Sequence, residues 1–433
     1  MIMDRRVVVT GVGLVSPIGL TVEDNVAALK GGISGIKPVN SFDCSHCPVK
    51  IAGEISGFDP SLYVKKKKSL KLMNRTIEFA VAATELAFRD SGLEIEKLDP
   101  FRVGVSLGTE GTQYTIDEVS SAFEASTDTG KGFNPHKFGS EGYKTLNPLW
   151  PLMASPNMSL CHIGINYNIQ GPNMTFCSLA SAGAQAVGEA VNSIKHNEAD
   201  IFVAGGSESI NTVTILYLAL HNLLSHSNDR PDAASRPFER DRNGVVVGEG
   251  AGIVILEELG HALKRGADIY GEVVGYSTSI YGNRLNAGDD IFFTSAEGAE
   301  ACMNMALRNA GLNSNEIDYI NADGQSSVQA DRAETDAVKR VFGDRAREVF
   351  ISSTKSMMGH LLCSSASAEL IVSLLSIRDG FVPPTINYDN ADGYCDLDFT
   401  PNFAKEAKID TVMSNSFGLG GENATLIVKR FCG

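Results

Sequence analysis

The residues GPNMTFCSLASAG, from Gly171 to Gly183, open the part of this chain that says most about its architecture. The alanine-rich segment Ser181–His196 follows and predicts a helix, because alanine and straight-chain residues favour helical backbone. After it, the apolar run Ile201–Ala204 predicts a buried strand that leads into Gly205-Gly206. A helix followed at once by a buried strand is typical of α/β proteins.

Strand and helix patterns alternate along the rest of the chain. Apolar periodicity predicts helices at Met73–Asp90, which Gly92 ends, and at Cys302–Ala310. Short β-branched or apolar runs predict strands at Arg6–Val12, Val103–Leu107, Gly252–Glu257, Gly271–Tyr276, Tyr319–Asn321, Glu348–Ser352 and Thr411–Ser414. This alternation favours parallel sheets covered by helices. In contrast, Glu110–Asn157 is rich in Ser, Thr, Gly and Asn and predicts a long functional or mobile loop.

Composition restricts the possible functions. The chain has 433 residues, 43% of them hydrophobic, which suits a large globular core. The formal charge of −15 argues against nucleic acid and anionic membranes as main partners. The apolar run that follows the first residues is too short for a signal or membrane-spanning segment. Eight cysteines without a paired framework favour a reducing cytoplasm.

Two short motifs give weak hints of a bound metal or cofactor. Cys44-Ser45-His46-Cys47 has the spacing of half a zinc site, but no second pair completes it, and two free thiols in a loop explain it better. Gly11-Val12-Gly13 follows a predicted strand, as in a dinucleotide-binding loop, but the third glycine is missing. We therefore expect no metal and no cofactor.

Several longer motifs, in order, resemble those of the β-ketoacyl-acyl-carrier-protein synthases, the condensing enzymes of fatty acid and polyketide synthesis. They are Gly171–Gly206 and, further on, Arg236–Gly250, Ser353–His360, Pro383–Asn387 and Asn415–Asn423. The elongating type II synthases match best. The resemblance implies the thiolase-like α/β fold, in which two similar halves form five αβαβα layers, and a dimer. We place the halves at 1–265 and 266–433.

Internal similarity supports two halves only weakly. Each half has a predicted glycine-rich turn, at Gly205-Gly206 and at Gly418–Gly421. Each also has a helix of small residues, at Ser181–Ala190 and at Leu361–Leu370.

In that family a reactive cysteine lies nine residues after the leading glycine and about twenty-four residues before the strand that ends VAGG. Both counts lead to Ala180, so the nucleophile position holds a methyl group. Cys177 lies three residues too early. Ser178 and Ser181 are alternative nucleophiles, but a serine needs an adjacent base, and we expect both to pack the helix.

The family's catalytic site also contains two histidines. The resemblance places the first at Asp323, which is a carboxylate here, and the second at His360, which is present. Lys355 and Glu369 match the accessory lysine and glutamate. In the family, Ala180 and Leu419 correspond to the oxyanion-hole and gate positions. Whether His360 and Lys355 still catalyse a reaction or only fill structural roles stays open.

The two replacements have different consequences. Ala180 cannot accept an acyl group covalently. We expect Asp323 to face the carboxylate of a bound malonyl group, where two like charges about 4 Å apart repel by roughly 4 kcal/mol at an effective dielectric constant of 20. A protonated Asp323 would escape this repulsion.

One basic cluster interrupts the acidic surface, and the family docks its acidic carrier protein with basic residues of the same region. The cluster consists of Lys65, Lys66, Lys67, Lys68, Lys71 and Arg75. A solvated helix face is the alternative interpretation.

Three hypotheses about function follow, and whether the chain is an enzyme stays open. The first is a non-condensing, chain-length-factor-like subunit that binds acyl carrier protein and forms a heterodimer with an active synthase. The second is an enzyme with altered chemistry on acyl- or malonyl-carrier protein, a decarboxylase or an acyltransferase, as a homodimer or heterodimer. The third is an active 3-oxoacyl synthase carrying an engineered Cys-to-Ala change at Ala180. Asp323 argues against the third, because one substitution already removes the nucleophile.

Overall fold

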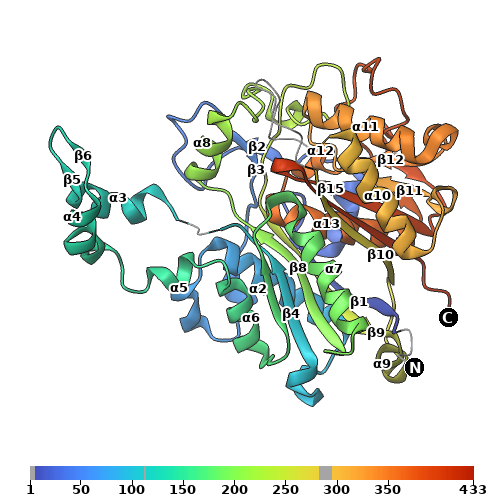
Figure 1. The fold of residues 1–433 in the computed structure, drawn as a ribbon, viewed down its shortest axis with the longest axis horizontal. Coiled ribbons are helices and arrows are strands. Elements are labelled where there is room, and N and C mark those ends of the chain that lie inside the picture. The colour runs from blue at the N-terminus through green and yellow to red at the C-terminus, as the bar shows by residue number, and fades with distance from the viewer. Residues whose placement is uncertain (1–4, 112–113, 282–294) are drawn as a thin grey trace.

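The computed structural model describes residues 5–111, 114–281 and 295–433, and within these ranges ten strands are joined in one hydrogen-bonded order (Figure 1). The order is β12-β11-β15-β16-β10-β1-β9-β8-β4-β7. Their bounds are β1 Val7–Val15, β4 Val103–Gly108, β7 Asn173–Phe176, β8 Ile201–Glu208, β9 Gly250–Glu258, β10 Gly271–Ile280, β11 Tyr319–Asn321, β12 Phe350–Ser352, β15 Thr411–Phe417 and β16 Glu422–Lys429.

The strand pairing repeats itself in the two parts of the chain. β1, β9, β8, β4 and β7 pair in that order, first antiparallel twice and then parallel twice. β10, β16, β15, β11 and β12 show the same pattern. Among the described strands, β1 and β10 form the only hydrogen-bonded pair between the two five-stranded sets. This repetition agrees with the expected similar halves, although the boundary at 265 stays a prediction.

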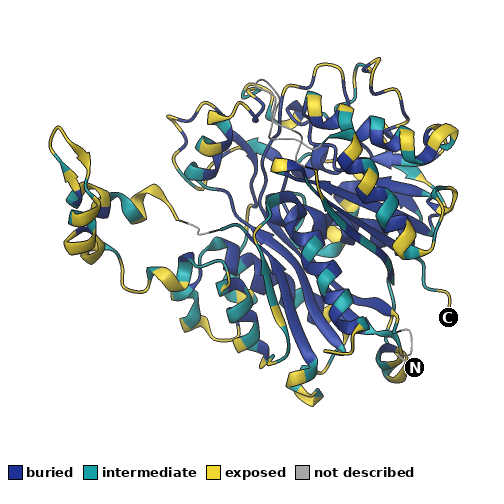
Figure 2. Cartoon of the chain, viewed as in Figure 1, coloured by how far each residue is buried: buried dark blue, intermediate teal, exposed yellow. Residues whose placement is uncertain are grey.

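Helices cover both sets of strands and separate them, which gives the expected α/β layers (Figure 1). α2 (Arg75–Ser91) and α6 (Met158–Tyr167) pack on the N-terminal strands, and α10 (Ala296–Ala310) packs on the C-terminal strands beside α11 (Val328–Phe342). α7 (Ala182–Lys195) and α13 (Ser365–Asp379) lie between the two sets and contact each other. Residues 365–377 of α13 are all buried, as expected of a helix inside the core (Figure 2).

Shorter elements complete the chain. The remaining helices are α1 Val22–Gly31, α3 Ile116–Ala125, α4 Pro135–Ser140, α5 Trp150–Ala154, α8 Thr212–Leu220, α9 Leu259–Arg265 and α12 Lys355–Met358. The remaining strands are β2 Ile36–Pro38, β3 Ile51–Gly53, β5 Thr127–Asp128, β6 Gly132–Phe133, β13 Phe381–Val382 and β14 Lys405–Glu406. No helix within the described residues is both long and apolar enough to cross a membrane.

Most of the predicted helices and strands are confirmed. In the first strand, two glycines have a packing role. Gly11 and Gly13 lie inside β1, where a Cβ on Gly13 would come within 1.9 Å of the Ala83 carbonyl oxygen. These glycines allow α2 to approach β1 closely. Because β1 continues through them without a turn, they do not form a dinucleotide-binding loop. The turn predicted at Gly205-Gly206 is wrong, because both residues lie within β8.

The loop predicted for Glu110–Asn157 is also wrong over most of its described length. It contains α3, α4 and α5 and the short strands β5 and β6, and it projects from the body with a largely exposed surface (Figures 1 and 2). Thr115 and Glu118 form a capping box at the start of α3, and Asn134 caps α4. Polar residues that indicated a loop act here as helix caps.

Candidate active site

Ala180 lies at a sharp bend between β7 and α7. The preceding residue, Leu179, has a φ of 46°, a conformation that leucine rarely adopts. A short 3-10 turn, Leu179–Ser181, then leads directly into α7. Gly183 lets this bend approach α13, since a Cβ there would come within 3.0 Å of the Cys363 carbonyl oxygen. The chain therefore has a strained bend at Ala180, the residue that the sequence motif predicts for the nucleophile position.

The Ala180 methyl group faces a pocket that is mostly apolar. Apolar side chains from several elements form its wall. They include Leu179 of the bend, Leu218 of α8, Leu224 after α8, Leu362 after α12, Phe417 at the end of β15 and Leu419 just beyond it. The polar residues at its surface include Glu110, Gln325 and His360. Ala180 and Leu419, assigned from sequence to one site, thus share one pocket, whose wall suits an acyl chain.

His360 presents one ring nitrogen to this pocket. Its Nδ1 accepts a hydrogen bond from the backbone N–H of Leu362 at 3.0 Å and lies 3.2 Å from the hydroxyl of Ser365. Burial, together with the charge of Lys355, lowers the pKa of His360 well below its usual value. The neutral ring with an accepting Nδ1 carries its proton on Nε2. His360 can therefore donate a hydrogen bond to an oxygen atom in the pocket.

Asp323, Lys355 and Glu369 meet in a buried ionic cluster. The Lys355 ammonium donates to Asp323 Oδ1 at 3.0 Å and to Glu369 Oε1 at 2.6 Å. The side chains of all three residues are about 2% exposed. Although burial opposes it, the two carboxyl groups raise the pKa of Lys355. Burial raises the pKa of Glu369 to about 8, so one ammonium need not balance two full negative charges.

This cluster corrects the expected role of Asp323. Its second oxygen, Oδ2, accepts from Gln325 Nε2 at 2.6 Å, so both carboxylate oxygens are bound within the protein. Gln325, and not Asp323, lines the pocket. The repulsion between Asp323 and a malonyl carboxylate was predicted from sequence without the Lys355 ammonium group, which offsets the charge of Asp323. Lys355 forms its second ion pair with Glu369.

Buried acidic side chains hold the loop that carries Asp323 and Gln325. Glu334 accepts the backbone N–H groups of Asp323 and Gly324 at 3.0 and 2.8 Å. Asp331 accepts the N–H of Gln325 at 2.9 Å. Burial raises the pKa of Asp331 to about 6 and that of Glu334 to about 8.

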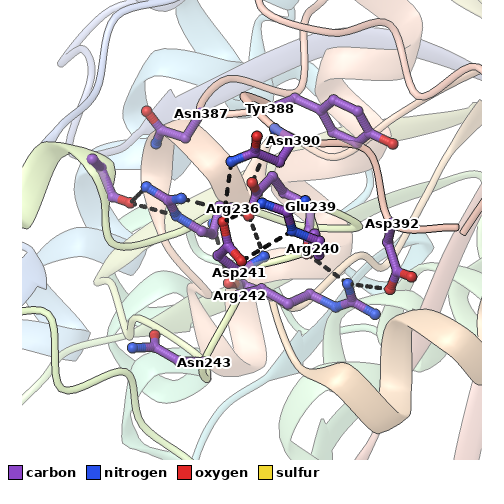
Figure 3. A network of polar contacts seen from close by, with 12 residues as sticks. Arg236, Glu239, Arg240, Asp241, Arg242, Asn243, Asn387, Tyr388, Asn390 and Asp392 are labelled. Atoms are coloured by element: carbon purple, nitrogen blue, oxygen red, sulfur yellow. Dashed lines mark hydrogen bonds and ion pairs between the residues drawn. The ribbon is translucent and has the colours of Figure 1, made fainter.

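A polar network beside this loop joins the segment 236–243 to residues 387–392 (Figure 3). Arg242 is fully buried and lies 3.1 Å from Asp331 and 2.8 Å from Asp392. Glu239 accepts the backbone N–H of Asn390 at 3.0 Å. Contacts therefore run from Asp392 through Arg242 and Asp331 to the loop at the pocket wall, which fixes Gln325.

One pair of residues at this site, Glu110 and Glu208, was not predicted from the sequence. β4 and β8 are parallel neighbours, and these carboxyl groups lie at or just beyond their C-terminal ends. Glu208 is fully buried, whereas Glu110 reaches the pocket. Two sequence motifs could have indicated this pair, namely Gly108-Thr109-Glu110 and Gly206-Ser207-Glu208. Each follows a predicted strand, and ligands bind at the carboxyl ends of parallel strands.

The alternative nucleophiles have other contacts. The Cys177 thiol is exposed and lies 3.7 Å from the Glu110 carbonyl oxygen, and burial of its surroundings raises its pKa. Ser178 donates to Gln185 at 2.7 Å, and Ser181 donates to the Ser178 carbonyl oxygen at 3.1 Å. These two serines stabilise the start of α7, as expected from sequence.

The basic cluster divides into two parts. Its lysines are exposed, namely Lys65, Lys66, Lys67, Lys68 and Lys71. Arg75 instead forms an ion pair at 2.6 Å with Glu249, a fully buried carboxylate, and also donates to the Ile55 carbonyl oxygen. The lysines can meet an acidic partner, whereas Arg75 holds the fold together.

Cys44 and Cys47 are buried among apolar side chains. In the part of the chain that the structure describes, no three His, Cys, Asp or Glu side chains are grouped as a metal site would require.

Comparison with known proteins identifies the family. Residues 4–262 match the family model of the β-ketoacyl synthase N-terminal domain, and residues 270–389 match that of the C-terminal domain. The chain is 42% identical to a 3-oxoacyl-[acyl-carrier-protein] synthase 2 of Coxiella burnetii over 98% of this chain and 99% of that protein.

Solved structures agree. The ishigamide ketosynthase/chain length factor is 31% identical with a TM-score of 0.86, covering 99% of this chain and 100% of that one. A type II PKS acyl-carrier protein in complex with its ketosynthase (AntDE:AntF) gives 29% identity and a TM-score of 0.80 at the same coverage. With its thiolase-like fold and its motifs in register, the chain belongs to the β-ketoacyl synthase family.

Proposed function

We propose that this β-ketoacyl synthase relative is a non-condensing partner subunit in the synthesis of a fatty acid or polyketide. The methyl group of Ala180, at a bend that the fold retains, carries this proposal. No covalent acyl intermediate can form there, although the apolar pocket remains. The similarity to the ishigamide ketosynthase/chain length factor supports a role beside an active synthase.

Carrier-protein docking at the exposed lysines of the basic cluster belongs to the same proposal. One structural neighbour is a ketosynthase in complex with an acyl-carrier protein. The chain as a whole has a charge of −15, so these lysines are a local positive surface toward an acidic protein.

Co-purification from native cells tests the assembly. We expect a cysteine-bearing homologue to copurify with this chain in a one-to-one complex. The isolated chain should bind acyl carrier protein without forming an acyl-enzyme adduct in mass spectrometry. Recovery of a lone homodimer from native cells would contradict the proposal. Finding a cysteine codon for position 180 in the natural gene would instead favour an active synthase.

Altered chemistry is the second candidate, and His360 supports it. His360 lines the pocket, and its Nε2–H can stabilise the enolate that forms when a malonyl thioester loses carbon dioxide. Incubation with malonyl- and acyl-carrier proteins, with carbon dioxide release and acyl exchange as readouts, tests this activity. His360→Gln is the matched variant, and the absence of both signals in the unmodified protein removes this candidate.

A further inference from the structure

The carboxyl groups of Glu110 and Glu208 are brought together by backbone contacts. Gly108, the last residue of β4, pairs with Gly206 of β8. Glu110 and Glu208 each follow two residues later, Glu110 just beyond β4 and Glu208 at the end of β8. Glu208 Oε2 accepts the backbone N–H of Glu110 at 2.9 Å, and its Oε1 accepts that of Ser209 at 3.0 Å. The position of the Glu208 carboxyl group is therefore fixed.

The backbone contact brings the two carboxyl groups close together, and two carboxylates this close repel each other unless one of them is protonated. Burial raises the pKa of both carboxyl groups, and their proximity raises that of Glu208 further. The described residues provide Glu110 with no ion pair that would drive its proton away. Burial and mutual repulsion thus favour one proton on the pair over ionisation of both groups.

Glu110 brings this pair to the pocket wall. When its proton is directed to Glu208, the remaining oxygen atom of Glu110 can only accept a hydrogen bond from a ligand. A plain hydrocarbon chain would displace water from this oxygen and replace no hydrogen bond. The polar surface of the pocket thus has an acceptor at Glu110.

His360 gives independent evidence that the pocket holds a polar ligand. Its side chain is only 6% exposed, and Nε2 has no hydrogen-bonding partner among the described residues although it lies at the same pocket. Its donor suits a thioester carbonyl oxygen. A ligand that satisfies both groups has a carbonyl oxygen for His360 and an O–H or N–H group for Glu110.

We propose that Glu110, positioned by Glu208, forms a hydrogen-bonding subsite that selects acyl groups carrying a hydroxyl or amino group over plain hydrocarbon chains. The inference rests on the proposed function only in that the pocket receives an acyl group. It names the class of acyl group, which neither the family models nor the relatives specify.

Calorimetric titration with carrier-free thioesters tests it. Butyryl-, 3-hydroxybutyryl- and 3-aminobutyryl-pantetheine share one carbon skeleton, so their affinities differ only through the added group. We expect at least one polar thioester to bind about tenfold more tightly than butyryl-pantetheine, the factor that a lost buried hydrogen bond imposes. Tighter binding of the hydroxyl compound indicates that Glu110 prefers a neutral donor on the ligand. Tighter binding of the amino compound alone indicates that Glu110 prefers a cationic donor.

Glu110→Met keeps the length of the side chain and should abolish or reverse the preference. Glu124→Met makes the same change at an exposed position of α3 that does not line the pocket, so it is the matched control and should keep the preference. Glu110→Gln retains an accepting oxygen and should keep a preference for the hydroxyl. Equal affinities in the unmodified protein, or an unchanged preference in Glu110→Met, overturn the inference. If none of the thioesters binds, both this inference and the proposal that the pocket receives an acyl group are wrong. The co-purification experiment tests the partner-subunit proposal independently.

Discussion

Replacing Lys355 by methionine should destabilise the protein strongly, because it leaves the Asp323 carboxylate buried without its cation. Methionine has nearly the length of lysine and fills the same space. At the observed 3.0 Å the ion pair contributes about 5.5 kcal/mol of attraction at an effective dielectric constant of 20. The cost of desolvating both groups offsets part of this gain in the native protein. Loss of one partner of a buried pair typically costs about 3–5 kcal/mol.

A second estimate of this cost comes from protonation. The uncompensated carboxylate can escape by taking up a proton, and for an ordinary aspartate this costs about 4 kcal/mol at pH 7. Glu369, whose pKa burial raises to about 8, already holds most of its proton there and adds little. The two estimates agree. Because the variant then folds with uptake of a proton, its penalty should shrink by about 1.4 kcal/mol for each pH unit below 7.

Urea unfolding followed by circular dichroism measures the effect. Lys339→Met is the matched control, since Lys339 pairs with Asp396 at the surface and should cost below about 1 kcal/mol. Adding Asp323→Asn to Lys355→Met removes the uncompensated charge and should restore part of the lost stability. The reasoning is refuted if Lys355→Met costs no more than the control, or if the double variant is no more stable than Lys355→Met alone.

Three further predictions concern the nucleophile position, pH and carrier binding. Ala180→Cys in a Cys177→Ser background should react with iodoacetamide, because the pocket reaches this position, and mass spectrometry of the alkylated peptide checks it against Cys177→Ser alone. Burial raises the pKa of Asp331 to about 6 and of Glu369 to about 8, so the folded chain keeps protons that the unfolded chain releases near pH 4. The free energy of unfolding should therefore fall between about pH 4 and 8, on the order of 3 kcal/mol for Asp331 alone, and a constant urea midpoint would contradict this. Lys66→Glu should weaken binding of acyl carrier protein in fluorescence titrations, and the difference should shrink as salt shortens the Debye length from about 10 to 3 Å.

Local sequence patterns predicted the main elements of this fold correctly. The strand at Tyr319–Asn321 and the helix ended by Gly92 depend on residues within a few positions of each other. The two counts that lead to Ala180 are local in the same way, since the bend at Ala180 and the helix that follows are continuous in sequence. The lysines of the basic cluster were also predicted as a surface, and they are exposed.

The sequence by itself thus determined the succession of helices and strands, the family motifs and the absence of a nucleophile at Ala180. Only the tertiary structure decided what surrounds that methyl group. Asp323 meets Lys355 across 32 residues, and the backbone of Glu110 meets Glu208 across 98 residues. Such contacts depend on strand order and helix packing, which periodicity does not encode. For that reason the sequence showed that position 180 has no nucleophilic atom. The fold showed that Lys355 offsets the charge of Asp323, and that Glu110 and Glu208 form a carboxyl pair at the pocket wall.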